Sequence, residues 1–208
     1  MSTDTGHTGL RERKKHKARN DILDAARLLI ERQGFENTTM RDIADAADVS
    51  YQTLYNYYAS KAQVVQALLS RETDPIVDRL NALFADAEID LVDHIHAATK
   101  LLFDVVAQRD RHLWREVVVL VFRDPSDFFA HFFDHYTMAQ VRIARLFERA
   151  RQHGKLDPGV DVTLLAQTLY AIIDFAFLQY VADPGMSKAA VLKRLRGQVA
   201  LLLKPYRR

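Results

Sequence analysis

The chain has 208 residues, 49% hydrophobic and 27% charged, with a formal net charge of +2. This composition allows a folded protein with a sizeable core and excludes a disordered chain, and the absence of cysteine excludes disulfides and thiolate chemistry. No segment resembles a signal peptide or approaches the roughly 18 uncharged apolar residues of a membrane span, so we expect a cytoplasmic protein without a membrane partner.

Glycine and proline are scarce, and between them apolar residues recur every three to four positions. This period predicts an all-α protein of about nine helices. Residues 1–14 are expected to form a disordered basic tail, residues 15–75 a first domain and residues 76–208 a second. Six Lys or Arg and one Glu lie between Arg11 and Arg19, which suits either a solvated helical turn or an arm that touches phosphate.

Two short helices are predicted between residues 39 and 58. Thr39 and Asp42 have the spacing of a capping box, and Ser50 can cap the following helix. A turn of three or four residues separates the two helices, which is the anatomy of a helix-turn-helix. The small side chains of Ala44 and Ala47 would allow a close helix crossing.

The second of these helices has two different faces. With Leu54 placed inward, a turn of about 100° per residue puts Tyr58 inside as well. Gln52, Tyr55 and Asn56 then point outward. Amide groups suit the edge of adenine in a major groove and phenol hydroxyls suit phosphate oxygens, although the same residues also occur as plain solvated surface.

The segment from Gly34 to Leu69 resembles the DNA-binding domain of TetR/AcrR-type transcriptional regulators, and the resemblance covers about residues 15–70. The matching residues are Gly34-Phe35, Thr38-Thr39, Arg41-Asp42-Ile43-Ala44, Val49-Ser50, Leu54-Tyr55 and Ser60-Lys61. Two positions depart from the family pattern. Tyr58 stands where Phe is common and needs a partner for its hydroxyl, and Tyr51 stands where a small residue is common.

The resemblance implies the roles of individual residues. Thr39 would contact the DNA backbone, the start of the third helix would reach base edges, and Tyr55, Tyr57 and Lys61 would bind phosphate. The full expected DNA-binding set is Thr39, Arg41, Ser50, Tyr51, Gln52, Thr53, Tyr55, Asn56, Tyr57 and Lys61.

Beyond this domain, helices are expected at about 61–84, 91–108, 111–122, 127–153, 161–182 and 187–204. The resemblance implies that this region binds a ligand and forms a homodimer through the last two helices. The helix at 161–182 is apolar nearly all round, so a partner chain could cover one face, or the helix could be fully internal.

An aromatic group in this region is expected to line a ligand pocket, although such stripes can also be plain core. A pocket of this kind would take a small hydrophobic or aromatic effector. The expected ligand-binding residues are Phe103, Trp114, Phe122, Phe129, Phe133, Tyr136 and Phe177.

Little else in the sequence suggests chemistry. His131 and His135 share a helical face with Asp127, but two histidines and one carboxylate make no complete metal site. Asp104 and Asp174 interrupt apolar runs, and we expect each on the wetter side of its helix. No glycine-rich phosphate loop or nucleophile motif appears, so we expect no enzyme, metal or cofactor.

The sequence therefore predicts a ligand-responsive DNA-binding regulator, acting as a repressor on a palindromic double-stranded operator. The alternative is a small-molecule-binding helical dimer that does not bind DNA. This alternative stays open because residues 1–70 are nearly neutral, with nine acidic residues and ten Lys or Arg.

Overall fold

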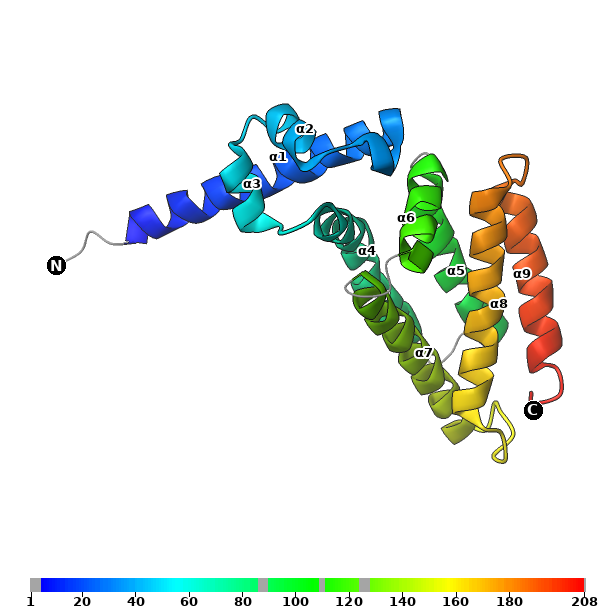
Figure 1. The fold of residues 1–208 in the computed structure, drawn as a ribbon. Coiled ribbons are helices and arrows are strands. Elements are labelled where there is room, and N and C mark those ends of the chain that lie inside the picture. Colours follow the sequence, from blue (N-terminus) through cyan, green and yellow to red (C-terminus); the bar gives the residue numbers. More distant parts are fainter. Residues whose placement is uncertain (1–4, 86–89, 109–110, 124–127, 208) are drawn as a thin grey trace. The chain divides into compact units, whose positions relative to one another are not determined.

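The computed structural model describes the backbone of residues 5–85, 90–108, 111–123 and 128–207. Side chains are described outside residues 1–11, 72–75, 85–89, 109–110, 112, 120–136 and 208. The described residues form helices joined by short loops, with one isolated backbone bridge between Leu156 and Arg207. The helices are α1 (Thr5–Asn37), α2 (Met40–Ala46), α3 (Tyr51–Tyr57), α4 (Lys61–Ala85), α5 (Leu91–Ala107), α6 (Arg111–Arg123), α7 (Phe128–Gln152), α8 (Val162–Ala182) and α9 (Lys188–Leu203) (Figure 1).

The all-α prediction is confirmed, and the predicted helices from residue 61 onward agree with α4 to α9 within a few residues. The disordered tail is wrong for residues 5–14, because α1 already begins at Thr5. Lys and Arg are good helix formers, which accounts for the helix at residues 11–14 but not for the glycine-containing residues 5–10. The chain divides into two compact units, the head (residues 1–71) and the C-terminal unit (residues 72–208), and α4 contributes to both.

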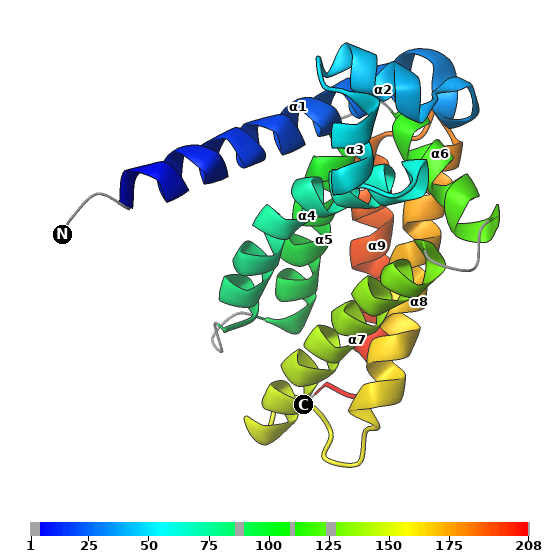
Figure 2. The same ribbon diagram turned by 60° about the vertical axis from the view of Figure 1, so that its left-hand side comes forward.

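The head has its own core around the first three helices (Figure 2). Gly34, inside α1, takes the backbone angles φ 81° and ψ 164°, which breaks the helix before α2. The ion pair between Arg71 and Asp24, 2.9 Å long, ties α4 to α1. The buried core residues of the head are Ile22, Leu23, Ala25, Ala26, Leu29, Ile30, Ile43, Ala44, Ala47, Leu54, Tyr58, Val64, Val65 and Leu68.

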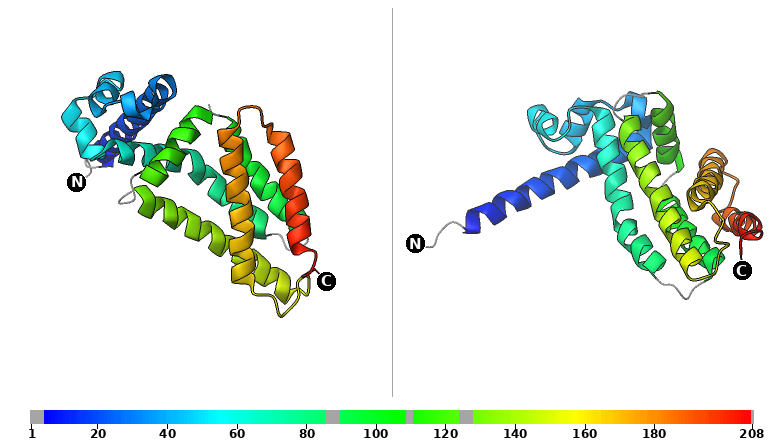
Figure 3. Two further views of the ribbon diagram at one scale, coloured as in Figure 1. Left: turned by 45° about the vertical axis from the view of Figure 1, so that its right-hand side comes forward. Right: turned by 90° about the horizontal axis from the view of Figure 1, so that it is seen from below.

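The C-terminal unit has a continuous apolar core. It is formed by residues of α4, α5, α7, α8 and α9, among them the fully buried Phe147 and Leu169. Helices α8 and α9 lie side by side in both panels of Figure 3. The two last helices therefore pack against each other within this unit.

Helix α8 has one buried face and one exposed apolar face. Leu165, Leu169 and Tyr180 are buried, whereas Leu164 and Phe175 are 60% and 62% exposed. By length and composition alone α8 could cross a membrane, which corrects the expectation that no segment approaches a membrane span. The same composition is found in helices that a protein partner covers.

Candidate nucleic-acid interface

The turn between α2 and α3 is fixed by side chains at both helix starts. Thr39 Oγ1 accepts a hydrogen bond from the Asp42 backbone N–H (3.1 Å), and Asp42 Oδ2 accepts one from the Thr39 backbone N–H (2.9 Å). The bond from the Thr39 backbone holds the pKa of Asp42 below its ordinary value. Ser50 Oγ accepts from the Thr53 backbone N–H (3.0 Å). Both caps follow the predicted pattern, and they set the start of each short helix.

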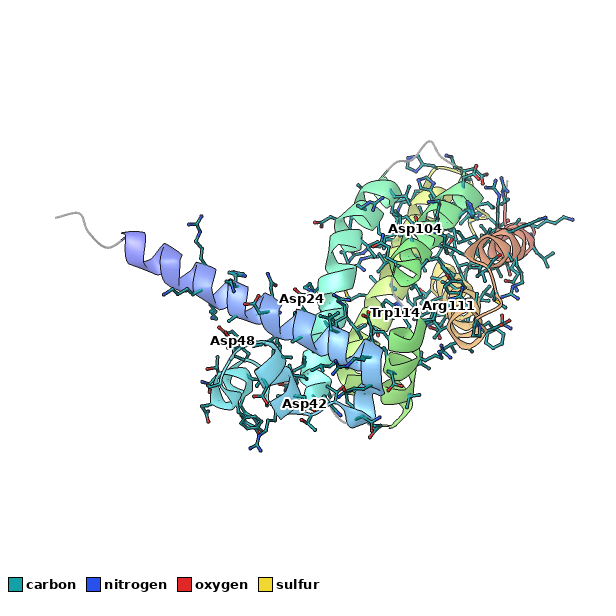
Figure 4. All side chains as sticks on the ribbon, turned by 90° about the horizontal axis from the view of Figure 1, so that it is seen from above. Asp24, Asp42, Asp48, Asp104, Arg111 and Trp114 are labelled. Atoms are coloured by element: carbon teal, nitrogen blue, oxygen red, sulfur yellow. The ribbon has the colours of Figure 1, made fainter. Side chains whose placement is uncertain are left out.

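Asp48 makes the bend between the two helices. Its φ of 53° lies in the left-handed region, and no other non-glycine residue in the described backbone has a positive φ. Asp is one of the few residue types that tolerates this conformation. Figure 4 labels Asp42 and Asp48, which stand at the start of α2 and just after its end.

The inward face of α3 supports the helix on the head's core. Leu54 is fully buried and Tyr58, just beyond the helix, is 7% exposed. Ile43 and the small side chains Ala44 and Ala47 are also buried. The hydroxyl of Tyr58 accepts a hydrogen bond from Arg19 Nε at 3.2 Å. This contact supplies the partner that a Tyr in place of Phe requires.

The outward face of α3 carries the predicted polar groups. Gln52 and Asn56 are exposed, and Gln52 Nε2 donates to Asn56 Oδ1 at 3.2 Å. Tyr51 and Tyr55 are 46% and 48% exposed, with ring centroids 6.0 Å apart. One face of a two-turn helix therefore presents two amides and two phenols to solvent, all on a rigid support.

The remaining predicted DNA contacts surround this face. Thr39, Arg41 and Ser50 are exposed, and Thr53 is half-buried against the Ser50 hydroxyl at 2.8 Å. Tyr57 is also half-buried, and its hydroxyl donates to the Lys15 backbone carbonyl at 3.5 Å. Tyr57 thereby links α3 to the basic segment of α1.

Lys61 is placed differently from the expectation of a side chain free to reach phosphate. Its ammonium donates to the backbone carbonyls of Phe35 and Thr38 (2.7 Å for Thr38) and lies 3.9 Å from the centre of the Phe35 ring. These carbonyls follow the Gly34 break, where the helix leaves acceptors without helical donors. In this structure Lys61 therefore closes the end of α1.

Sequence reasoning missed the structural roles of Arg19 and Lys61. Each contact joins residues more than 20 positions apart in the chain, so no local spacing in the sequence predicted it. The one available signal was the Tyr at position 58, whose extra hydroxyl demanded a donor or acceptor nearby.

A second group of aromatic residues lies in the C-terminal unit, against α8. Phe103 of α5 meets Tyr180 edge-on, with ring centroids 5.4 Å apart, and Trp114 of α6 meets Phe177 edge-on at 6.0 Å. Phe103 and Trp114 are buried, and Phe177 is half-buried. The other residues predicted to bind a ligand have side chains outside the described part of the chain: Phe122, Phe129, Phe133 and Tyr136.

Arg111 holds the start of α6 against the end of α8. Its guanidinium lies 3.8 Å from the centre of the Tyr180 ring and donates to the carbonyls of Tyr180 (3.1 Å), Asp183 (2.7 Å) and Met186 (2.8 Å). Arg111 and Trp114 are one turn apart on α6 and are both labelled in Figure 4. These bonds fix the start of α6 and so hold Trp114 in position against Phe177.

Two polar groups near these rings lack partners among the described residues. Trp114 Nε1 is buried without a hydrogen-bond acceptor. Asp174, one turn before Phe177 on α8, is half-buried, and desolvation raises its pKa. The expectation of a wetter side for Asp174 holds only in part, because its neighbours Ala171 and Phe175 are exposed whereas the carboxyl itself is half-buried. Asp104 instead lies between Lys100 and Lys188, at 2.8 and 2.7 Å, and their hydrogen bonds lower its pKa.

The described residues contain no group of three or more His, Asp or Glu side chains that could hold a metal ion. The side chains of Asp127, His131 and His135 lie outside that part of the chain.

Comparison with known proteins supports the helix-turn-helix. Residues 22–68 match the family model described as bacterial regulatory proteins, tetR family. The HTH-type transcriptional regulator UidR of Escherichia coli K12 is 23% identical over 186 residues, which cover 89% of this chain and 92% of UidR. YvkB of Bacillus subtilis, an uncharacterised HTH-type regulator, is 32% identical over 108 residues, covering 51% of this chain and 52% of YvkB.

Solved structures extend the similarity to the whole fold. SmeT, the repressor of the Stenotrophomonas maltophilia multidrug efflux pump SmeDEF, is 25% identical, with a TM-score of 0.68 over 91% of this chain and 90% of SmeT. The SmeT–triclosan complex gives a TM-score of 0.72 at 22% identity, over 92% of each chain. The helix-turn-helix, the family model and the full-length relatives agree, and the chain belongs to the TetR family of DNA-binding transcriptional regulators, which are not enzymes.

Proposed function

We propose that this regulator is a cytoplasmic homodimeric repressor that binds a palindromic operator and leaves it when a small apolar or aromatic effector binds. The observation that carries this proposal is the outward face of α3, where Gln52 and Asn56 stand exposed beside Tyr51 and Tyr55. Amide side chains of this kind can pair with the N6 and N7 atoms of adenine in the major groove. The phenol of Tyr55 would meet phosphate at the groove edge, and Tyr51, at the start of α3, would reach base edges.

The exposed apolar face of α8 supports the homodimer. Leu164 and Phe175 of α8 and Leu201 of α9 are 60%, 62% and 72% exposed, and each is a large apolar side chain. A second copy of the chain would cover this face and complete a four-helix layer from α8 and α9 of both subunits. Two-fold symmetry then places the two operator half-sites about 34–36 Å apart, or a multiple of that distance.

The rings around Trp114 support an effector site in the C-terminal unit. Trp114 Nε1 would donate to an acceptor on the effector, and the rings of Trp114 and Phe177 would contact its apolar body. SmeT, with the same fold, forms a complex with triclosan, an aromatic molecule with oxygen acceptors. Such an effector releases DNA only if it binds the non-binding arrangement of the heads more tightly than the binding one.

A titration of the DNA flanking the protein's own gene tests the proposal, with gel shift and fluorescence anisotropy as readouts. Gln52→Ala should change which operator variants are preferred, with losses of about 1–3 kcal/mol at the contacted base pair. Tyr55→Phe keeps the ring and removes one phosphate contact, so it should weaken binding to all operator sequences by the same factor. If Gln52→Ala lowers the affinity for all operator variants equally, Gln52 does not read a base.

Two outcomes separate the proposal from its alternative. Phe175→Glu should dissociate the dimer in sedimentation experiments and weaken operator binding, while the monomer keeps its helical content. If the wild-type dimer shows no sequence preference for any genomic fragment, the chain is the helical small-molecule binder without DNA binding.

A further inference from the structure

A cleft in the C-terminal unit lies apart from the aromatic group. It is about 370 Å³ in volume and is bounded by the second half of α4 and by α7, which run side by side in Figure 3. The cleft shares no residue with the aromatic group around Trp114. Its lining residues are Asn81, Phe84, Arg142, Arg145, Glu148, Arg149 and Gln152.

Three arginines dominate the charge of this cleft. Arg142, Arg145 and Arg149 follow each other at intervals of three and four residues, so they share one face of α7. Like charges at this spacing on a helix repel each other. The single acid of the lining, Glu148, is bound by Arg151, which lies outside the lining, at 2.6 Å, and by Gln152 Nε2 at 3.0 Å. The arginines thus gain little neutralisation from it.

The three arginines do not have the same task. Arg149 donates to the backbone carbonyl of Phe84 and so neutralises the negative end of α4. Arg142 and Arg145 make no hydrogen bond or ion pair with any residue that the structure describes. Two guanidinium groups are therefore available in the cleft, beside one that is fixed.

We propose that this cleft binds a small organic anion, through a phosphate or carboxylate group held by Arg142 and Arg145. Guanidinium groups bind these oxygens in a forked geometry, which makes Arg the preferred residue for such ligands. The amides of Asn81 and Gln152 can donate to further oxygens, and Phe84 gives the cleft an apolar wall. The volume lies at the lower end of small-molecule sites, about 300–1,000 Å³, so a small ligand fits better than a polymer.

The bound anion would bridge α4 and α7, because both helices line the cleft. It would stabilise the C-terminal unit by mass action, in proportion to the logarithm of its concentration. This site is independent of the operator and of the effector pocket in the proposed function.

Calorimetric titration of the full-length protein at fixed ionic strength tests the inference. The probes are pyrophosphate, succinate and phenyl phosphate, with phenol as the uncharged match of the last. Wild-type protein should bind at least one anion saturably and show no heat with phenol. The double variant Arg142→Gln/Arg145→Gln should bind at least about tenfold more weakly, since each charged hydrogen bond contributes on the order of the free energy of one decade in affinity.

Arg79→Gln is the matched control, because Arg79 is exposed on α4 and does not line the cleft. It should leave anion affinity unchanged. Equal affinities in all three proteins, or no saturation by any anion below about 10 mM, would overturn the proposal. Operator titrations of the same variants distinguish the sites. Unchanged operator affinity in the double variant fits the proposal, whereas a loss without any anion effect would assign these arginines to DNA.

Discussion

The two candidate sites of this protein are built in different ways. The candidate DNA-binding surface comes from the single seven-residue helix α3, whose start is fixed by Ser50 and whose inner side packs through Leu54. The aromatic group of the C-terminal unit comes from α5, α6 and α8, and its members Phe103 and Tyr180 are 77 positions apart by number. A site within one element can be derived from helix period and caps. A site drawn from three elements depends on packing that the sequence does not state.

The largest effect should come from removing the support of α3. Leu54→Ala leaves a cavity under the helix and should lower the free energy of unfolding of the head by about 2–5 kcal/mol. The protein contains one tryptophan, Trp114, which lies in the C-terminal unit. In urea titrations the far-UV circular dichroism should therefore show an earlier partial transition, while the Trp114 fluorescence midpoint stays in place.

Leu169→Ala provides the reciprocal experiment. Leu169 is fully buried in the core of the C-terminal unit, so its loss should shift the Trp114 midpoint by a comparable amount. If the circular dichroism and the Trp114 fluorescence shift together in both variants, the two units unfold as one, and the stabilities of the two units cannot be compared separately.

Removing the ammonium of Lys61 should have the next largest effect. Lys61→Met keeps the apolar stem on Phe35 and leaves the Thr38 carbonyl without its lysine donor, whereas the Phe35 carbonyl still accepts from the Thr38 backbone N–H. We expect a loss of about 1.5–3 kcal/mol in the stability of the head, measured by urea denaturation. Lys17→Met is the control, since among the described residues the ammonium of Lys17 is paired with the exposed side chain of Asp21 alone, and the loss of this pair should lower stability little.

The salt dependence of operator binding separates the two roles assigned to Lys61. A phosphate contact by Lys61, as the family resemblance implies, predicts that its loss lowers the salt slope by about one. The observed contacts predict an unchanged slope together with the lower stability. A reduced slope in a fully folded variant would show that the ammonium leaves the α1 carbonyls when DNA binds.

Much of this structure was predictable, and the limits have physical causes. Helix bounds from residue 61 onward followed from period, proline and glycine, and the faces of α3 and α8 followed from the helical angle. The helical state of residues 5–14 was missed because their polar and basic residues were interpreted as a disordered tail, although the Lys and Arg of residues 11–14 favour helix. The role of Lys61 and the contact between Arg19 and Tyr58 were missed because they depend on the path of the chain in space.

Asp174 should affect stability less than Lys61, and in the opposite direction. Burial raises its pKa, so the folded protein holds the proton more tightly than the unfolded chain does. The ionised Asp174 carboxylate therefore lowers the free energy of unfolding. This destabilisation is absent at a pH below the ordinary carboxyl pKa and develops as the pH rises through the raised pKa. Asp174→Asn should therefore raise the Tm at pH 7 by about 2–4 °C if removing the charge recovers about 1 kcal/mol.

The gain from Asp174→Asn should vanish below about pH 4, where the native carboxyl is protonated. Asp104→Asn is the control with the opposite sign. The lysines beside Asp104 lower its pKa, so its contribution is present above the ordinary carboxyl range and is lost as the pH falls. A Tm loss at pH 7 in both variants would mean that Asp174 has a stabilising partner.

The smallest effect should come from the bend between α2 and α3. Asp48 has φ 53°, a conformation that glycine adopts without strain, so Asp48→Gly exchanges backbone strain for greater freedom of the unfolded chain. We expect a change in unfolding free energy within about 0.5 kcal/mol of zero. Asp45→Gly, also exposed but inside α2, should instead cost about 0.5–1 kcal/mol, because glycine weakens a helix interior. Equal losses in the two variants would mean that the turn does not need a left-handed residue, and the geometric link between the two short helices would have to come from the buried Ala44 and Ala47 alone.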